Sequence, residues 1–239
     1  MRAVRKLTHH STAVLLLLAG LWLASPACSL GAEGTLHYLP EGRPDAAVLL
    51  APPPLAHSAE QAADLAAVAA ASRACTTNEA AVAFGEKKFS VFNFTPVIGA
   101  CLQPGKLPKT EAFFERVQKD AAIATDAAKE YWKRPRPFTV DPSLASGKLE
   151  KSFGYPSGHA TEAMVLALVL GELFPEQREA VTAIGRDIGW HRVWIARHYP
   201  TDIFAGRVFA QAIVREMKAD PRFQHDLAEA KAEIETRSR

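Results

Sequence analysis

The chain has 239 residues, 48% of them hydrophobic and 23% charged, and a formal net charge of +2 at pH 7. A chain of this length suits one domain, or two small ones, with a sizeable core, and its composition excludes a disordered or fibrous protein. So small a charge excludes a nucleic-acid-binding protein that neutralises many phosphates. Any chemistry on phosphate must therefore come from cations placed locally.

The first residues have the pattern of a signal peptide. A positive start is followed by an uncharged run from Ala13 to Ala24, shorter than the ~20 residues that a membrane-spanning helix needs. We expect a cleaved signal peptide over residues 1–27 and a mature domain over 28–239 that is periplasmic or secreted, with no stable membrane span. Lipid attachment at Cys28 is an alternative that the preceding residues disfavour.

Two cysteines remain once Cys28 is assigned to the signal region. Cys75 and Cys101 are then the one possible intrachain pair. Their spacing is compatible with a disulfide and equally with two free buried thiols, because sequence does not show how close the two residues come. No cysteines have the spacing of a zinc finger, and we expect no metal site.

The first part of the mature chain changes from extended to helical. Residues 38–56 are rich in proline, which predicts an extended segment. From Ser58 an alanine-rich stretch to Ala71 has high helix propensity. Thr110 is expected to cap a long helix whose apolar residues recur at steps of three and four, and Pro135 ends that helix.

The second part is helical throughout. Residues 160–174 are apolar almost all round, which predicts a buried helix at the centre of the fold. Further helices are expected over Glu176 to about Trp190, over Ile203 to Met217 and from Pro221 onwards. Few strand-like alternations occur. We therefore expect an all-α fold, a single compact helical domain with a buried central helix after the Pro-Ser-Gly-His motif.

Three segments carry unusual chemistry, and the first is a basic run from Lys129 to Pro137. A solvated basic face, or a cap on the helix dipole, is the ordinary explanation for such a run. Two prolines beside the arginines fix the backbone, however, so that Arg136 would be held in a defined direction. A bidentate anion clamp requires such a fixed guanidinium.

The second segment, Gly154 to His159, comes directly before the apolar helix. A helix N-terminus offers free N–H groups to an anion. Ser157 can add a hydroxyl donor, and Gly158 lets a ligand approach the backbone closely. The alternative is an ordinary turn and N-cap, with His159 a satisfied polar residue.

The third segment runs from His191 to Asp202, and Pro200 divides it between two helices. Asp202 can accept the Nδ1 proton of His198 and leave Nε2 as an oriented nucleophile or base. One histidine and one aspartate do not complete a metal site. The alternative is an N-cap at Asp202 and a core histidine.

In combination the three segments are far more specific. Their order is Lys129 with Arg136-Pro137, then Pro156 to His159, then Arg192, His198 and Asp202. This order resembles the type 2 phosphatidic acid phosphatase superfamily, which includes vanadium haloperoxidases. Over most of residues 38–236 the chain is similar to the bacterial class A non-specific acid phosphatases. His191 departs from that pattern, which usually has serine before the arginine.

The resemblance implies an acid phosphatase that needs no cofactor or metal and forms a phosphohistidine. The implied phosphate-binding residues are Lys129, Arg136, Ser157, Gly158 and Arg192, and the implied catalytic residues are the nucleophile His198, its partner Asp202 and the proton donor His159. The implied substrates are phosphorylated small molecules, with a broad range and phosphotransfer as a side activity, and the implied assembly is a homo-oligomer. Because free histidine has a pKa near ~6.5, we expect a mildly acidic optimum.

Three other functions remain open from the sequence. A vanadate-dependent haloperoxidase would use the same cations to hold vanadate. A membrane lipid phosphatase would need an apolar run of spanning length, and none follows the signal. A non-catalytic helical protein that binds anions would need neither histidine, and the presence of both argues against it.

Overall fold

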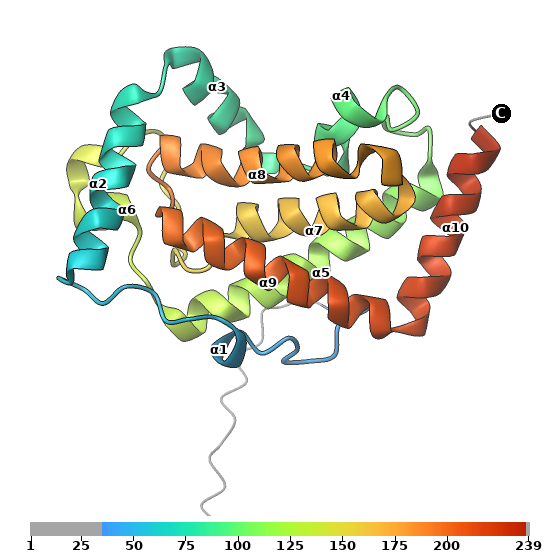
Figure 1. Ribbon diagram of the computed structural model, residues 1–239, viewed down its shortest axis with the longest axis horizontal. Helices are drawn as coiled ribbons and strands as arrows, with labels where there is room; N and C mark the ends of the chain where they lie inside the picture. Colours follow the sequence, from blue (N-terminus) through green and yellow to red (C-terminus); the bar gives the residue numbers. More distant parts are fainter. Residues whose placement is uncertain (1–34, 238–239) are drawn as a thin grey trace, which may run out of the picture. The chain divides into compact units, whose positions relative to one another are not determined.

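The structure, a computed structural model, describes residues 35–237 of the chain (Figure 1). Within this range it contains helices and no strand, so the expectation of an all-α fold is confirmed. The main helices are α2 (Ala59–Ala74), α3 (Thr77–Gly85), α5 (Pro108–Trp132), α7 (Gly158–Leu173), α8 (Arg178–Trp194), α9 (Pro200–Ala219) and α10 (Pro221–Arg237). The short helical segments are α1 (Ala46–Leu49), α4 (Thr95–Ile98), α6 (Pro137–Val140) and the 3₁₀ turns η1 (Glu86–Lys88), η2 (Val91–Phe94), η3 (Pro142–Leu144) and η4 (Pro175–Gln177).

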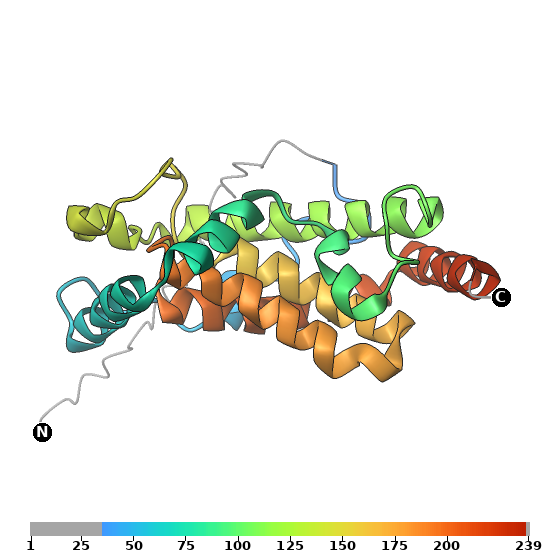
Figure 2. The ribbon, with the colours of Figure 1, turned by 90° about the horizontal axis from the view of Figure 1, so that it is seen from above.

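Helix α7 is the central helix, as predicted. It packs against α5, α8 and α9, which surround it in the views of Figures 1 and 2. Ala163, Val165 and Leu166, which point to different sides of α7, are all fully buried. A helix that is apolar all round is stable only when other helices cover every side of it, which explains this position.

Close packing brings the N-terminal ends of α7 and α9 together. An ideal Cβ on Gly206 of α9 would lie 2.9 Å from the carbonyl oxygen of Ser157 and 3.0 Å from Oγ1 of Thr161. No side chain larger than hydrogen fits this contact without a shift. The N–H of Ser157 also donates to the carbonyl of Asp202 at 3.1 Å. The two helix starts that carry motif residues are thereby fixed against each other.

Two details of the N-terminal half differ from the expectations. Residues 38–56 are not extended throughout, because Asp45 caps the short helix α1 by accepting the N–H of Ala47 at 2.9 Å. Thr110 is not a cap either: α5 starts at Pro108, and Oε2 of Glu233 accepts the Thr110 hydroxyl at 2.8 Å. Sequence spacing does not reveal such a contact, since α10 lies far along the chain.

The remaining helix predictions are confirmed with small shifts. Ser58 caps α2, which runs to Ala74, and α10 starts at Pro221. Helix α8 continues past Trp190 to Trp194, so that His191 and Arg192 lie within a helix. Tyr131, in the last turn of α5, is 63% exposed.

Other expectations concern residues outside these helices. The predicted signal peptide lies outside the described residues. Between residues 35 and 237, no helix combines the length and the apolar character needed to cross a bilayer.

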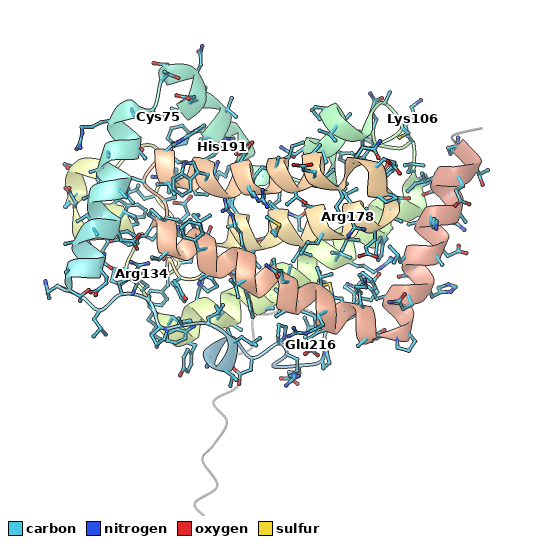
Figure 3. The ribbon with its side chains drawn as sticks, in the orientation of Figure 1. Cys75, Lys106, Arg134, Arg178, His191 and Glu216 are labelled. Carbon is cyan, nitrogen blue, oxygen red and sulfur yellow. The ribbon has the colours of Figure 1, made fainter. Side chains whose placement is uncertain are left out.

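Cys75, in the turn between α2 and α3 (Figure 3), and Cys101, after α4, are free thiols that are partly buried.

Candidate active site

The predicted site residues come from five separate parts of the chain. Lys129 lies in the last turn of α5, Arg136 precedes α6, and Ser157 to His159 begin α7. Arg192 lies in the last turn of α8, while His198 and Asp202 flank the start of α9. The contacts described below bring all of them to one place at the N-terminal end of α7.

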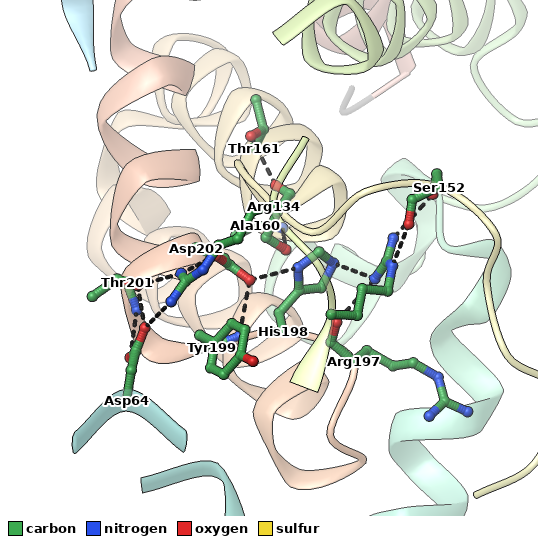
Figure 4. A network of polar contacts seen from close by, with 12 residues as sticks. Asp64, Arg134, Ser152, Ala160, Thr161, Arg197, His198, Tyr199, Thr201 and Asp202 are labelled. Carbon is green, nitrogen blue, oxygen red and sulfur yellow. Dashed lines mark hydrogen bonds and ion pairs between the residues drawn. The ribbon is translucent and has the colours of Figure 1, made fainter. Parts of the chain in front are cut away.

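His198 is held from both sides of its ring (Figure 4). Its Nδ1 lies 3.3 Å from Oδ2 of Asp202, and its Nε2 lies 3.1 Å from Nη1 of Arg136. A guanidinium only donates hydrogen bonds, so Nε2 is the acceptor and the ring proton resides on Nδ1. The nitrogen with the electron pair therefore faces the guanidinium of Arg136.

The surroundings keep this imidazole neutral. Burial lowers the pKa of His198 well below its ordinary value, and the nearby cations Arg136 and Lys129 lower it further. Burial raises the pKa of Asp202 to about 6, against the opposing effect of the Arg134 guanidinium. Near neutral pH the pair is thus a neutral imidazole beside a carboxylate, the protonation state that a nucleophilic histidine requires.

Asp202 is itself positioned by a buried network that the sequence did not reveal. Nη1 of Arg134 donates to Oδ1 of Asp202 at 2.5 Å, and Nη2 donates to Oδ2 of Asp64 at 2.7 Å (Figure 4). Thr201 joins the network by donating its hydroxyl to Asp64. Arg134 belongs to the basic run already noted, but nothing in the sequence links it to Asp64 on α2.

Arg136 has the fixed direction that the two prolines predicted. Its Nε donates to the carbonyl of Ser152 at 2.7 Å and its Nη2 to the hydroxyl of the same residue at 3.0 Å. Its Nη1 donates to the carbonyl of Arg197 at 2.9 Å. Burial lowers the pKa of Arg136. A guanidinium held at three nitrogens has a fixed direction and loses little entropy when it meets an anion.

The ammonium group of Lys129 lies next to Gly158 at the start of α7. An ideal Cβ on Gly158 would lie 3.2 Å from Nζ of Lys129 and 3.4 Å from Oε1 of Glu162, so glycine leaves room for the ammonium group. Asp126 accepts a hydrogen bond from Nζ at 2.8 Å. Ser157, fully buried, is the N-cap of α7 and accepts the N–H of Ala160 at 3.3 Å.

Glu162 is another residue near the site that the sequence analysis did not identify. It lies one turn along α7 from Gly158, and Gln118 of α5 donates to its Oε2 at 3.1 Å. Burial raises its pKa to about 7, while Lys129 acts in the opposite direction. Its position within an apolar helix is the signal that could have drawn attention to it, because a carboxyl there must find polar partners.

His159 and Arg192 lie on the side of the site formed by α3 and η1. Nε2 of His159 lies 3.2 Å from the carbonyl oxygen of Glu86, and its ring packs against Phe89. Burial lowers the pKa of His159 well below its ordinary value, and Arg192 and His198 lower it further. The premise of an ordinary histidine pKa near ~6.5, on which the expected acidic optimum rested, therefore does not hold for either histidine.

His191, the departure from the family pattern, has defined partners. Its Nδ1 lies 2.9 Å from Oε2 of Glu86, and its ring stacks on that of Trp194 with centroids 4.3 Å apart. The same carboxylate oxygen accepts a hydrogen bond from Nη2 of Arg192 at 3.1 Å. The departure thus removes no charge from the site and adds a partner to Glu86.

Among residues 35–237, no group of three or more histidine, cysteine, aspartate or glutamate side chains is arranged to hold a metal ion.

Comparisons with known proteins found one similar family and several similar proteins. Residues 121–224 match the model of the PAP2 superfamily, and all eight candidate site residues lie within this range. The chain is 32% identical over 147 residues to a non-specific acid phosphatase of Salmonella typhi, and the alignment covers 59% of each protein. It is 30% identical over 142 residues to an acid phosphatase of Zymomonas mobilis, covering 57% of this chain and 54% of that protein.

One solved structure is also similar. It is a transmembrane PAP2 type phosphatidylglycerolphosphate phosphatase from Bacillus subtilis, with a TM-score of 0.49 and 20% identity, matched over 73% of this chain and 89% of that one. The two acid phosphatases are matched only in part: the chain spans less than two thirds of the length of each of them. Residues 121–224, which contain the eight candidate site residues, are thus similar to the PAP2 superfamily.

Proposed function

We propose that this protein is a metal-independent acid phosphatase that hydrolyses phosphate monoesters through a phosphohistidine on His198. The observation that carries the proposal is the placement of that histidine, with Nδ1 on Asp202 and Nε2 facing Arg136. A buried neutral imidazole held in one tautomer beside a fixed cation is suited to attack an electrophile that carries negative charge.

The cations and the start of α7 suit a phosphoryl group. Lys129, Arg136 and Arg192 would each face one of its non-bridging oxygens and stabilise the charge that develops in the transition state. The hydroxyl of Ser157 and the N–H of Gly158 would add hydrogen bonds at the positive end of the helix dipole. Cations supply here the stabilisation that bound metals give in other phosphatases.

The reaction would proceed in two steps. Nε2 of His198 forms a bond to phosphorus while the bond to the leaving oxygen breaks, and His159 gives that oxygen a proton. A water molecule then attacks phosphorus and the nitrogen–phosphorus bond breaks. The water's proton returns to His159, phosphate leaves, and both histidines regain their starting states.

A bound substrate would itself help His159 to acquire its proton. Burial and Arg192 lower the pKa of this histidine. A phosphate dianion beside the ring acts in the opposite direction and raises the pKa of His159. We therefore retain the mildly acidic optimum as a prediction, with the substrate's charge as its cause. A pH profile of kcat/KM that peaks well above neutrality would contradict it.

The similar proteins and the predicted signal peptide support proposals for the substrate and for the cellular location. We propose phosphorylated small molecules as substrates, with a broad range, because the similar proteins are named as non-specific acid phosphatases. Transfer of the phosphoryl group to an alcohol in place of water is a possible side reaction of the same intermediate. The predicted signal peptide supports a periplasmic or secreted enzyme, and the homo-oligomer stays a prediction from the resemblance.

The first test is hydrolysis of p-nitrophenyl phosphate at mildly acidic pH in EDTA, with and without vanadate. The purified protein is compared with His198→Ala and with His225→Ala, which changes an exposed histidine of α10. We expect turnover that survives EDTA, is blocked by vanadate, disappears in His198→Ala and persists in His225→Ala.

Other outcomes separate the competing functions. Vanadate binding without hydrolysis contradicts the phosphatase, and bromide oxidation with vanadate and peroxide would then identify a haloperoxidase. Binding with neither activity would identify an anion-binding protein. Activity that is lost in EDTA and restored by a metal ion contradicts the metal-independent mechanism.

A further inference from the structure

Glu86 connects three of the polar side chains around the site. It is the first residue of η1, directly after α3, and its side chain is 12% exposed. Its carboxylate accepts from Arg192 and pairs with His191, and its main-chain carbonyl lies 3.2 Å from Nε2 of His159. Glu86 lies outside the range 121–224 that matches the PAP2 superfamily, so the family motif assigns it no role.

The contacts of Arg192 show what the carboxylate does. Both hydrogen bonds of the guanidinium use Nη2, one to Oε2 of Glu86 and one to the carbonyl of Ala83. Nε of Arg192 is buried and has no hydrogen-bond partner. A buried donor without a partner is costly. Nε of Arg134 and of Arg207 also has no partner, but the Arg192 charge acts on both His159 and His198, which places this guanidinium beside the candidate site. Because the guanidinium is planar, fixing Nη2 also fixes the direction of Nε.

His191 holds the carboxylate of Glu86 in turn. Its Nδ1 lies 3.0 Å from Oε1 and 2.9 Å from Oε2, and the stacked ring of Trp194 supports it. His191 and Arg192 are neighbours in α8, so both contacts tie Glu86 to the same helix end. This arrangement gives a structural reason for a histidine at this position.

The main-chain carbonyl of Glu86 fixes a tautomer. A carbonyl oxygen only accepts hydrogen bonds, so Nε2 of His159 carries the proton of the neutral ring. Nδ1 is then the nitrogen that takes up a second proton and can pass it on. A side-chain substitution at Glu86 leaves this carbonyl in place, which makes the role of the carboxylate testable by itself.

We propose that Glu86 is a positioning residue for phosphoryl transfer: its carboxylate orients Arg192 so that Nε faces the phosphoryl group. The proposal rests on the proposed function, since it assigns Arg192 to the phosphoryl oxygens. Glu86 does not touch the substrate, and its influence passes through Arg192.

The test compares Glu86→Gln with Glu235→Gln, which changes an exposed glutamate of α10. Binding of inorganic phosphate is measured by titration calorimetry, and hydrolysis of p-nitrophenyl phosphate by steady-state kinetics. We expect the Kd for phosphate and the KM to rise roughly tenfold in Glu86→Gln, the size of one lost charge-assisted hydrogen bond, and kcat to fall as well, because Arg192 also meets the charge that develops in the transition state. Glu235→Gln should match the unsubstituted protein.

A double-mutant cycle with Arg192→Ala tests whether the effect passes through the arginine. Adding Glu86→Gln to Arg192→Ala should change the Kd for phosphate less than twofold. An unchanged Kd in Glu86→Gln, or a full tenfold effect in the Arg192→Ala background, overturns the proposal. Tighter phosphate binding in Glu86→Gln also overturns it, because Glu86 would then compete with phosphate.

Two arrangements keep the test decisive. If Glu86→Gln does not fold, His191→Ala removes the other partner of the carboxylate, and an unchanged Kd for phosphate in that variant overturns the proposal. If the unsubstituted protein binds phosphate without hydrolysing its esters, the proposed function fails. The calorimetric comparison still tests Glu86 in that case.

Discussion

Nδ1 of His198 and Oδ2 of Asp202 lie 3.3 Å apart in a fully buried contact. The same oxygen accepts the N–H of Tyr199 at 2.9 Å, while Oδ1 accepts from Arg134. The carboxylate is therefore fixed at both oxygens before it meets the imidazole. This contact sets the direction of Nε2, the atom on which the proposed chemistry depends.

Asp202→Asn tests that contact. The amide preserves shape but removes the charge and can donate where the carboxylate accepts, so the imidazole loses its tautomer and orientation. We expect kcat to fall on the order of 10⁴-fold, as for another buried aspartate–histidine pair, while KM changes little. Steady-state kinetics beside Asp187→Asn, an exposed aspartate of α8, measure the effect. A loss of kcat under threefold would contradict the assigned role.

Arg134→Gln tests the buried network behind Asp202. The variant leaves the carboxylates of Asp64 and Asp202 buried without their shared cation. The free energy of unfolding should fall by about 3–5 kcal/mol in urea titrations. Arg222→Gln is the control: Arg222, 67% exposed, pairs with Asp220, and its loss should lower the free energy of unfolding far less. Equal losses in both variants would show that the network does not depend on burial.

His159→Ala tests the proton donor through the leaving group. p-Nitrophenolate leaves readily without a proton, whereas an alkoxide does not. The variant should therefore lose at least about tenfold more kcat/KM with glycerol phosphate than with p-nitrophenyl phosphate. Parallel assays on both substrates measure the ratio. Equal losses would mean that His159 acts in binding or folding and not as the acid.

Glu162→Gln tests the partly buried carboxyl beside Lys129 through stability. The pKa of Glu162 is raised from 4.5 to about 7, so the folded protein loses stability as pH rises through this interval and Glu162 ionises. Glutamine cannot ionise. The free energy of unfolding of the variant, relative to the unsubstituted protein, should therefore rise between pH 4.5 and pH 8, on the order of 3 kcal/mol.

The comparison isolates Glu162 because other titrating groups are common to both proteins. Asp202, whose pKa is about 6, contributes equally to each and cancels in the difference. Urea titrations at several pH values give the measurement. A difference that stays constant with pH would show that Glu162 has an ordinary pKa.

The sequence predicted what depends on local pattern. The apolar character of α7 predicted its burial, and Ser157 at its start predicted the helix N-terminus. The prolines around Arg136 predicted a fixed guanidinium, and its contacts with Ser152 agree with that. In each case the cause lies within a few residues of the effect.

What the sequence did not predict depends on contacts between distant segments. Asp64 meets Arg134 across 70 positions, and Arg192 lies 106 positions from Glu86. Neither acidic residue stands out from ordinary helix composition. The lowered pKa of His198 is also out of reach, because it comes from burial and from cations that the fold assembles.

Trapping the intermediate tests the central claim most directly. The protein is mixed with a radiolabelled phosphate monoester and quenched in alkali, since phosphohistidine survives base and is lost in acid. The account predicts a base-stable, acid-labile label on the peptide that contains His198, and no label in His198→Ala. Rapid turnover without label on that peptide, or an equal label in His198→Ala, would contradict it.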